Sequence, residues 1–502
     1  MKVDCLKFFL LFFILTFSNL LFSQVDTAWV RRYDGPGNHN DAATSLFVDN
    51  QGNVYVTGCS YNILTDFDYA TLKYDASGNL LWVRRYNGPG NGQDYATSLF
   101  VDNQGNVYVT GRSYDSLTNL DYATLKYDTN GNLLWERRYN GPGNHNDVAT
   151  SLFVDINSNV YVTGRSEVSG IDFDYATLKY DASGNLLWER RYNGPGNDYD
   201  EATSLFVDNQ GNVYVTGISF GSSTYYDYAT LKYDTNGNLL WVRRYNGPGN
   251  HNDAATSLFV DNQGNVYVTG CSYNILTDFD YATLKYDASG NLLWERRYNG
   301  PGNDYDEATS LFVDNQGNVY VTGRSYDSLT NLDYATLKYD ASGNLLWERR
   351  YNGPGNYNDG AASLFVDSDG NVYVTGSSEG SGTDLDYATL KYDTNGNLLW
   401  VRRYNGPGNG QDYPTSLFVD NQGNVYVTGD SWGSGTYYDY ATIKYIQEAP
   451  NISEGEENKS EKKMTKNKVY DISGKLVKEN KLKKGIYFKE TEKGIKKILI
   501  LK

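Results

Sequence analysis

Tryptophan recurs at a fixed interval along this chain, and the interval constrains the fold more than any other feature. Eight of the nine tryptophans lie 53 residues apart. A period near 50 residues is typical of β-propeller blades and exceeds the period of most helical repeats. We interpret these residues as structural, one in each copy of a repeated unit: Trp29, Trp82, Trp135, Trp188, Trp241, Trp294, Trp347 and Trp400.

Each unit contains four short segments with the composition of strands. In the first unit these are Ala43–Asp49, Asn53–Gly58, Asp68–Asp75 and Asn79–Tyr86, which are rich in Val, Thr and Tyr. The sequence DNQGN separates the first two segments, and DASGN separates the last two. An Asp that can bond forward to the backbone, followed by Gly and Asn, favours a tight hairpin. The unit is therefore predicted to be a four-stranded blade.

The two ends of the repeat region complement each other. The region begins with an isolated fourth strand, Ala28–Tyr33, and ends with three strands that close at Tyr440–Tyr445 without a fourth. Pairing of these elements would complete a blade and remove an open sheet edge. We therefore predict an all-β fold, an eight-bladed β-propeller of four-stranded blades over residues 25–446, in which the N-terminal strand completes the last blade.

The repeated unit resembles a known family of bacterial β-propeller repeats, SBBP. The resemblance rests on the strand NVYVTG and on the phrase DYATLKYDASGNLLW, forms of which recur through the units between Val25 and Ile446. It implies a β-propeller fold, and it does not fix a function.

The N-terminus has the features of an export signal. Lys2 and Lys7 provide a positive segment, Phe8–Phe22 is apolar, and Ser23 offers a small residue for cleavage. The apolar run is short for a membrane span. Residues 1–23 are therefore predicted to be a signal peptide. The mature protein is expected to be secreted or exposed at the cell surface, without a transmembrane span.

The C-terminal segment differs in composition from the repeats. Residues 447–466 are charged and poor in apolar residues, which predicts a linker. Residues 467–502 contain YDISGKLV and LKKGIYF and end in a basic, apolar run, and they resemble the C-terminal sorting domain of the type IX secretion system. The resemblance implies contact with that export machinery and attachment to the exterior of the outer membrane. A small β appendage with a stabilising role is the alternative.

The charge of the chain narrows the choice of partners. The formal net charge is −17, although residues 466–502 hold 12 Lys and only four acidic residues. The repeats are therefore more acidic than the chain as a whole. Such a surface disfavours nucleic acid and anionic membranes as partners. We expect a monomer that does not bind nucleic acid.

The loops separate onto two faces because the strands of a blade alternate in direction. Both hairpin turns of each unit fall on one face, and the longer, more varied loops fall on the other. Loops between the second and third strands form four types that repeat after 212 residues, so matching loops lie in opposite blades. Exposed aromatic residues there suit stacking on sugars or contact with proteins, although rings folded back onto the blade are the alternative. The candidate ligand-binding residues are Phe220, Tyr225, Tyr226, Trp432, Tyr437 and Tyr438.

Few residues suggest an ion or a disulfide. Asp367, Asp369 and Asn371 resemble the start of a calcium loop, but the Glu that ends an EF-hand loop is missing. A hairpin turn is the other interpretation, and no further cofactor is expected. Cys59 and Cys271 occupy the same position in distant units and are expected to be unpaired. The paired arginines of the fourth strands are interpreted as protection of the blade edge.

The repetition argues against an enzyme. Catalysis needs an asymmetric set of groups, whereas the framework carries the same residues eight times. His39, His145 and His251 all follow NGPGN and are interpreted as solvated loop residues. We expect a non-catalytic propeller that binds extracellular polysaccharide or protein through its loop-rich face. The alternatives are a structural or adhesive display module and a carboxylate-dependent glycoside hydrolase.

Overall fold

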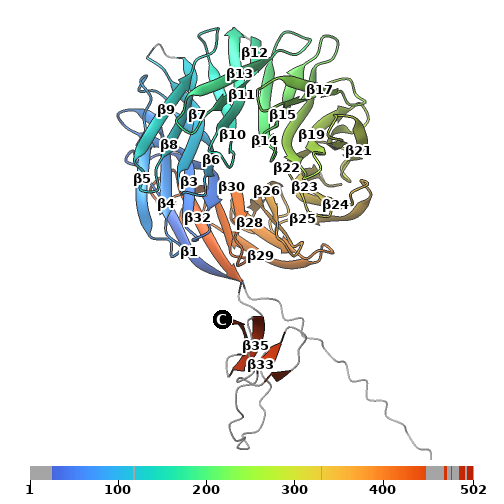
Figure 1. Ribbon diagram of the computed structural model, residues 1–502. Coiled ribbons are helices and arrows are strands. Elements are labelled where there is room, and N and C mark those ends of the chain that lie inside the picture. The colour runs from blue at the N-terminus through green and yellow to red at the C-terminus, as the bar shows by residue number, and fades with distance from the viewer. Residues whose placement is uncertain are drawn as a thin grey trace, which may run out of the picture. The chain divides into compact units, whose positions relative to one another are not determined.

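Eight antiparallel sheets of four strands surround a common axis, and each sheet is one blade (Figure 1). The computed structural model describes residues 25–116, 119–170, 172–328 and 331–447, together with strands between 469 and 500. No helix occurs in this described part of the chain. The prediction of an all-β, eight-bladed propeller with four-stranded blades is confirmed.

We number the blades 1 to 8 in chain order and name the four strands of each blade from the axis outwards (Figure 1). The inner strands are β2 (Asp41–Val48), β6 (Tyr95–Val101), β10 (Asp147–Val154), β14 (Asp200–Val207), β18 (Asp253–Val260), β22 (Asp306–Val313), β26 (Asp359–Val366) and β30 (Asp412–Val419). The second strands are β3 (Val54–Asn62), β7 (Val107–Tyr114), β11 (Val160–Ser169), β15 (Val213–Phe220), β19 (Val266–Asn274), β23 (Val319–Tyr326), β27 (Val372–Glu379) and β31 (Val425–Trp432). The third strands are β4 (Asp66–Tyr74), β8 (Leu120–Tyr127), β12 (Asp172–Tyr180), β16 (Tyr226–Tyr233), β20 (Asp278–Tyr286), β24 (Leu332–Tyr339), β28 (Leu385–Tyr392) and β32 (Tyr438–Gln447). The outer strands are β5 (Leu80–Tyr86), β9 (Leu133–Tyr139), β13 (Leu186–Tyr192), β17 (Leu239–Tyr245), β21 (Leu292–Tyr298), β25 (Leu345–Tyr351), β29 (Leu398–Tyr404) and, for blade 8, β1 (Val25–Tyr33).

An aspartate at the start of each hairpin turn holds the turn together. In blade 1 the Asp49 carboxylate accepts hydrogen bonds from the backbone N–H groups of Gln51 and Asn53, each at 2.9 Å. Gly52 has a φ of +78°, a left-handed conformation that glycine adopts at little cost. The same bonds recur around the ring. The face that carries these hairpins, here called the turn face, is therefore nearly uniform.

The apolar cores lie between blades. Between blades 1 and 2, Tyr55, Tyr69 and Trp82 pack against side chains from the inner three strands of blade 2. The Trp82 indole also donates a hydrogen bond to the Thr129 backbone oxygen in the next blade at 3.2 Å. All eight repeated tryptophans are only 7–9% exposed. The period of the sequence is therefore the spacing of these contacts between blades.

Strand β1 closes the ring. It pairs antiparallel with β32, beginning at Val25 opposite Gln447. Trp29 then joins the core shared with blade 1, where its indole donates to the Ala76 oxygen at 3.3 Å. The N-terminal strand thus supplies the outer strand of blade 8, as its isolated position in the sequence predicts.

The paired arginines of the outer strands connect blades, in place of the edge protection expected from the sequence. Arg84 donates through Nε to the Gly131 backbone oxygen of the next blade at 2.5 Å. Arg85 binds the Asp68 carboxylate of its own blade at 2.9 Å and the Tyr33 hydroxyl of the preceding blade at 3.2 Å. Equivalent pairs occur around the ring. The arginines therefore fasten each blade to both of its neighbours.

Replacing Arg85 by methionine is expected to destabilise the propeller by about 3 kcal/mol. The change keeps most of the side-chain volume but leaves the Asp68 carboxylate, 3% exposed, without its cation. The shift of the guanidinium-chloride unfolding midpoint measures the effect. Arg84→Met is the matched control and should cost less, about 1 kcal/mol, because its partners are neutral backbone oxygens, those of Val83, Asn130 and Gly131, and no buried charge loses its partner. Equal effects of the two changes would contradict this ranking.

The C-terminal region forms a second compact unit. The chain divides at Met1–Pro450 and Asn451–Lys502. One sheet in the second unit has the strand order β34-β33-β35-β36, as expected for a β appendage. The predicted signal peptide and, apart from Gln447, the predicted linker lie outside the described residues. In the described part, nothing helical is long and apolar enough to cross a bilayer. The strands of the second unit are β33 (Val469–Asp471), β34 (Leu476–Val477), β35 (Gly485–Thr491) and β36 (Gly494–Ile500).

Candidate functional site

The face opposite the turn face, here called the variable face, carries the loops that differ most between blades. It holds the connections between second and third strands and the NGPGN loops between blades. The six aromatic candidates lie there in two groups. These groups belong to blades four places apart, so the structure does not bring them into one site. They are Phe220, Tyr225 and Tyr226 in blade 4, and Trp432, Tyr437 and Tyr438 in blade 8.

Each aromatic group packs against a histidine from the next blade. Tyr437 stacks on His39 with ring centroids 4.2 Å apart, and Tyr225 lies over His251 at 4.3 Å. Both tyrosines remain about half exposed, 53% for Tyr225 and 47% for Tyr437. These two histidines, interpreted from the sequence as solvated, therefore take part in contacts between blades. One face of each tyrosine ring is already occupied.

The candidate calcium ligands lie in the hairpin turn of blade 7. The Asp367 carboxylate accepts hydrogen bonds from the backbone N–H groups of Asp369 and Asn371, at 3.0 and 2.9 Å. The Asn371 side-chain amide and the Tyr373 hydroxyl also donate to Asp367, at 2.8 and 3.0 Å. Both carboxylate oxygens therefore have protein donors. Because other blades repeat this arrangement, the geometry favours the hairpin interpretation over an ion site.

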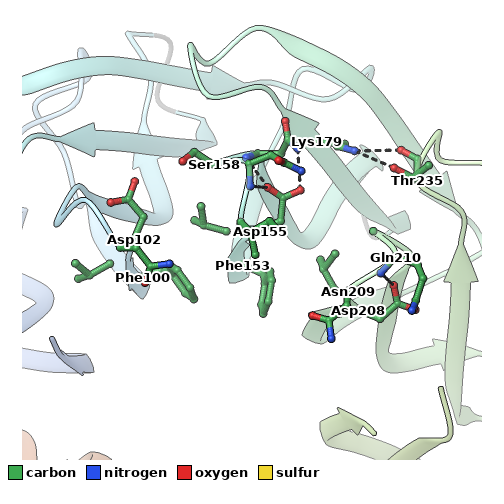
Figure 2. Close-up of a pocket in the computed structure, with 18 of the residues that line it drawn as sticks. Phe100, Asp102, Phe153, Asp155, Ser158, Lys179, Asp208, Asn209, Gln210 and Thr235 are labelled. Carbon is green, nitrogen blue, oxygen red and sulfur yellow. Dashed lines mark hydrogen bonds between the residues drawn. The ribbon is translucent and has the colours of Figure 1, made fainter. Parts of the chain in front are cut away.

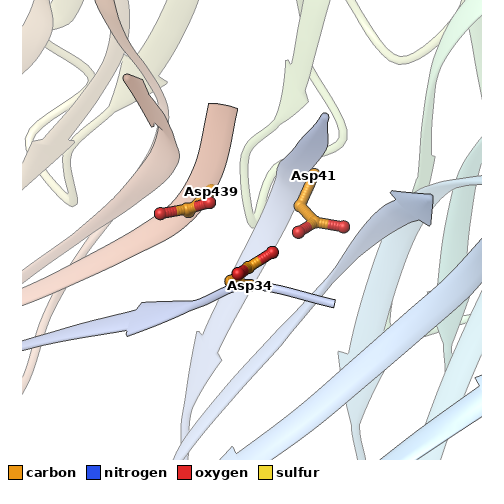
Figure 3. A group of neighbouring side chains, drawn as sticks. All are labelled: Asp34, Asp41 and Asp439. Atoms are coloured by element: carbon orange, nitrogen blue, oxygen red, sulfur yellow. The ribbon is translucent and has the colours of Figure 1, made fainter. Parts of the chain in front are cut away.

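Three carboxylates meet where blade 8 adjoins blade 1 (Figure 3). Oxygens of Asp34, Asp41 and Asp439 lie within 4.8 Å of one another. Asp439 is bound to Arg32 at 2.6 Å, and Asp41 accepts the backbone N–H of Gly35 at 2.7 Å. Asp34 is specific to this junction, since asparagine occupies the equivalent position, directly after the outer strand, in the other blades. Because a guanidinium already neutralises part of the group, we assign no metal to it.

Phenylalanines surround the axis near the turn face, and a cavity lies beside them. The cavity, of about 560 Å3, extends over blades 2 to 4 (Figure 2). Its charged groups have protein partners: Asp102, Asp155 and Asp208 each hold their own turn, and Lys179 donates to the Thr235 oxygen at 3.1 Å. The cavity therefore offers a ligand no unpaired charge among its described lining residues. The phenylalanine ring centroids lie 5.5–5.9 Å from their neighbours and belong to Phe47, Phe100, Phe153, Phe206, Phe259, Phe312, Phe365 and Phe418.

One cross-strand pair in each blade differs around the ring. It joins the inner strand to the residue that follows VTG in the second strand, close to the variable face. Apart from Cys59 and Cys271, these positions were not singled out from the sequence, although their variation inside a repeated framework was a visible signal. The pairs are Ala42 with Cys59, Tyr95 with Arg112, Val148 with Arg165, Glu201 with Ile218, Ala254 with Cys271, Glu307 with Arg324, Gly360 with Ser377, and Tyr413 with Asp430.

The charged members of these pairs have unequal partners. Arg165 binds Glu201 of the next blade at 2.9 Å. Arg324 binds Glu307 of its own blade at 2.6 Å. Arg112 lies over the ring of its cross-strand partner, 4.5 Å from the centroid. Both glutamates at this level are therefore neutralised by an arginine.

The two cysteines at this level are buried and free, as expected from their spacing. Burial raises the pKa of the Cys59 and Cys271 thiols to about 12. A thiol with so high a pKa is a poor nucleophile near neutral pH. The cysteines therefore act as small packing residues.

Comparison with protein families agrees with the fold. Residues 81–117 and 399–435 match the beta-propeller repeat family SBBP, which supports an SBBP-type propeller. The uncharacterized WD repeat-containing protein L264 of Acanthamoeba polyphaga mimivirus is 24% identical over 445 residues, 71% of this chain and 31% of that protein. The regulatory protein FlaEY of Caulobacter vibrioides is 30% identical over 158 residues, 29% of this chain and 16% of that protein. The chain spans less than a third of the length of either relative.

Solved structures with some likeness are distant in sequence. The β-propeller domain of the Trilobed protease from Pyrococcus furiosus has a TM-score of 0.40 and 10% identity, covering 71% of this chain and 99% of that chain. A polysaccharide lyase of family PL25, an ulvan lyase, has a TM-score of 0.41 and 10% identity, covering 74% of this chain and 93% of that chain. Likeness at this level says nothing about the function of this chain.

Proposed function

We propose that this SBBP-type propeller is a non-catalytic binding protein that holds carbohydrate or protein ligands on its variable face. One observation carries the proposal. The blades share one framework, whereas their side chains differ in the variable-face loops and in the cross-strand pairs beneath those loops. Binding residues concentrate on varied loops that a rigid scaffold holds in place. The turn face, in contrast, repeats one set of satisfied hydrogen bonds.

The carboxylates of the variable face support binding better than hydrolysis. A glycoside hydrolase acts through two carboxyl groups that flank the scissile bond. Glu201 and Glu307 are each bound by an arginine, so neither carboxylate is free to act on a glycosidic bond. A display module without a discrete site is the second candidate, and turnover of a glycan would favour the hydrolase instead.

The protein is further proposed to act outside the cell, attached to the surface, with matrix polysaccharides or proteins as partners. The apolar N-terminal segment and the resemblance of residues 467–502 to a sorting domain support this location. The C-terminal segment would then engage the export machinery. Protease digestion of intact cells tests the location, and a chain that stays protected until lysis would contradict it.

A thermal-unfolding screen of the full chain against glycans and matrix polymers tests the binding function. A ligand at about 100 times its Kd should stabilise the folded state by about 2.7 kcal/mol. Trp432→Ala in blade 8 and the matched Phe220→Ala in blade 4 show which aromatic group the ligand contacts. We expect the shift to vanish in at least one of them. If no polymer raises the unfolding temperature, the binding proposal fails and the display module is favoured.

A further inference from the structure

Blades 4 and 8 carry matching aromatic loops but differ in the cross-strand pair beneath them. Blade 4 has Glu201 on its inner strand and Ile218 on its second strand. Blade 8 has Tyr413 and Asp430 in the same places. The approximate two-fold repeat of the ring is therefore broken where an apolar residue in one half is a carboxylic acid in the other.

The Asp430 side chain faces blade 1. Asp430 is opposite Tyr440 in the register of β31 and β32, and opposite residues of an antiparallel pair lie on one face of the sheet. The Tyr440 hydroxyl donates to the Ala70 oxygen of blade 1 at 3.1 Å, which fixes the direction of that face. Asp430 is half-buried at this junction.

Asp430 lacks the cation that the other acids at this level have. Among the residues that the structure describes, the one hydrogen bond to its carboxylate comes from its own backbone N–H. Glu201 is bound by Arg165 at 2.9 Å. In blade 1, which Asp430 faces, the cross-strand pair at this level consists of Ala42 and Cys59, and neither carries a positive charge. The junction of blades 8 and 1 therefore holds a carboxylate, and the facing cross-strand pair supplies no arginine to neutralise it.

This arrangement is unfavourable for the protein alone. Burial, together with the nearby charge of Asp412, raises the pKa of Asp430 to about 7. The matching Ile218 shows that the fold accepts an apolar residue in this position. An unpaired acid that lowers the stability of the fold, in a position where an apolar residue would fit, is typical of a binding site.

Aromatic and polar side chains of blade 8 lie around the carboxylate. Trp432 is two residues further along β31 and therefore on the same face, with its ring edge-on to Tyr438 at 5.0 Å. The Tyr413 hydroxyl donates to Gln411 Oε1 at 2.6 Å, and the Tyr438 hydroxyl reaches the same oxygen at 3.4 Å. The site thus offers a carboxylate, ring surfaces and hydroxyl groups.

We propose that Asp430 binds the protonated amine of an amino sugar, whose ring lies against Trp432 and Tyr438. The inference rests on the proposed binding function and names its ligand class. An unpaired carboxylate is complementary to an ammonium group, and aromatic faces attract both cations and sugar rings. The acidic chain, with a net charge of −17, also attracts cationic ligands.

Two other cations fit this site less well. Calcium takes about six to eight oxygen ligands, whereas blade 8 presents one carboxylate here. A lysine side chain reaches its ammonium group through an alkyl stem, which gains little from the hydroxyl groups of Tyr413 and Tyr438. The hydroxyl groups of a sugar can exchange hydrogen bonds with both tyrosines and with Gln411.

Calorimetric titration of the full chain with a glucosamine trimer tests the proposal, with the N-acetylglucosamine trimer as the neutral analogue. Asp430→Asn removes the charge, and Asp430→Ile installs the residue of blade 4. Both changes are expected to weaken glucosamine binding at least about tenfold. The thermal midpoint should stay equal or rise, which shows that the variants fold. The matched Ile218→Val should leave the affinity unchanged.

Proton release separates direct contact from a structural role. An ammonium group favours the ionised form of the carboxylate, so binding near pH 7 should release protons from Asp430. The binding heat should then depend on the ionisation enthalpy of the buffer. In Asp430→Asn the binding heat should depend less on the buffer, because the protons that Asp430 releases are no longer part of the reaction.

Each outcome decides a separate point. Glucosamine binding that is equally strong in Asp430→Asn overturns the inference. Binding of neutral glycans alone overturns it too but leaves the proposed function standing. If lysine tripeptides bind through Asp430 and saccharides do not, the ligand class is wrong. If neither glycans nor proteins bind, the proposed function fails together with the inference.

Discussion

A chain that lacks β1 (Val25–Tyr33) is expected to lose the cooperative unfolding transition of the propeller. The truncation removes the outer strand of blade 8 and takes Trp29 out of the core shared with blade 1. It also removes Arg32, the cation of Asp439. Loss of a buried Trp alone costs about 3–5 kcal/mol, and a whole domain has only about 5–15 kcal/mol of stability. These losses together are expected to exceed the free energy of unfolding of the propeller.

Near-UV circular dichroism during denaturation measures this effect. The control is a chain that begins at Val25, and a synthetic peptide of residues 25–33 should restore the transition when added to the truncated chain. Restoration by the peptide would show that the lost element is the strand pairing and not the length of the chain. If the truncated chain unfolds at the same midpoint as the control, closure of the ring contributes little.

The ring could be predicted because its signals are local and repeated. Asp49, Gly52 and Asn53 determine a hairpin within five residues, and the same turn recurs along the chain. The repeats begin with a fourth strand that lacks a blade and end with a blade that lacks a fourth strand. Pairing of these two ends closes the ring. Trp82 marked the position of the interblade core, although the sequence could not name Thr129 as its hydrogen-bond partner.

Contacts between blades could not be predicted from the same patterns. Arg84 looks like a charge on an exposed edge until the next blade places the Gly131 oxygen beside it. His39 likewise follows a loop motif, and only the fold brings Tyr437 onto its ring. Such contacts join residues that are far apart in the sequence. Their geometry depends on the angle between blades, which no local pattern records.

The candidate site shows the same limit in another form. The aromatic loops were visible because they repeat after 212 residues. Asp430 was visible only as a difference within a repeat, and its meaning depends on the uncharged pair Ala42 and Cys59 in the blade that it faces. Comparing the matching blades position by position recovers this signal once the pairing of strands is known.

Lowering the pH from 7 to 5 is expected to stabilise the propeller by several kcal/mol. Each inner strand has a fully buried aspartate at or just before its start, 0–1% exposed. Burial raises the pKa of all eight, because the charged form is poorly solvated there. The pKa rises to about 6 in Asp41, Asp94, Asp147, Asp200, Asp253 and Asp306, and it is also raised in Asp359 and Asp412.

The sign follows from the difference between the folded and unfolded chains. An unfolded aspartate has a pKa of 3.8, so the folded protein binds more protons between that value and about 6. Stability is therefore present at the acidic end of this window and is lost as the pH rises through it. Each of the six aspartates should contribute about 1 kcal/mol between pH 7 and pH 5. Asp75, whose pKa is lowered by hydrogen bonds from Asn79, stays ionised throughout this range.

Urea unfolding between pH 4.5 and 8 at high salt measures the effect, since salt screens surface charges far more than buried ones. Asp200→Asn should remove one aspartate's share of the pH dependence, and Asp75→Asn should leave the slope between pH 5 and 7 unchanged. A stability that rises from pH 5 to pH 7 would contradict the prediction. It would mean that the N–H groups of Gly194 and Phe220, which donate to Asp200 at 2.6 and 3.1 Å, outweigh burial. The buried aspartates would then hold the ring together as anions, whereas the predicted slope makes them a source of instability near neutral pH.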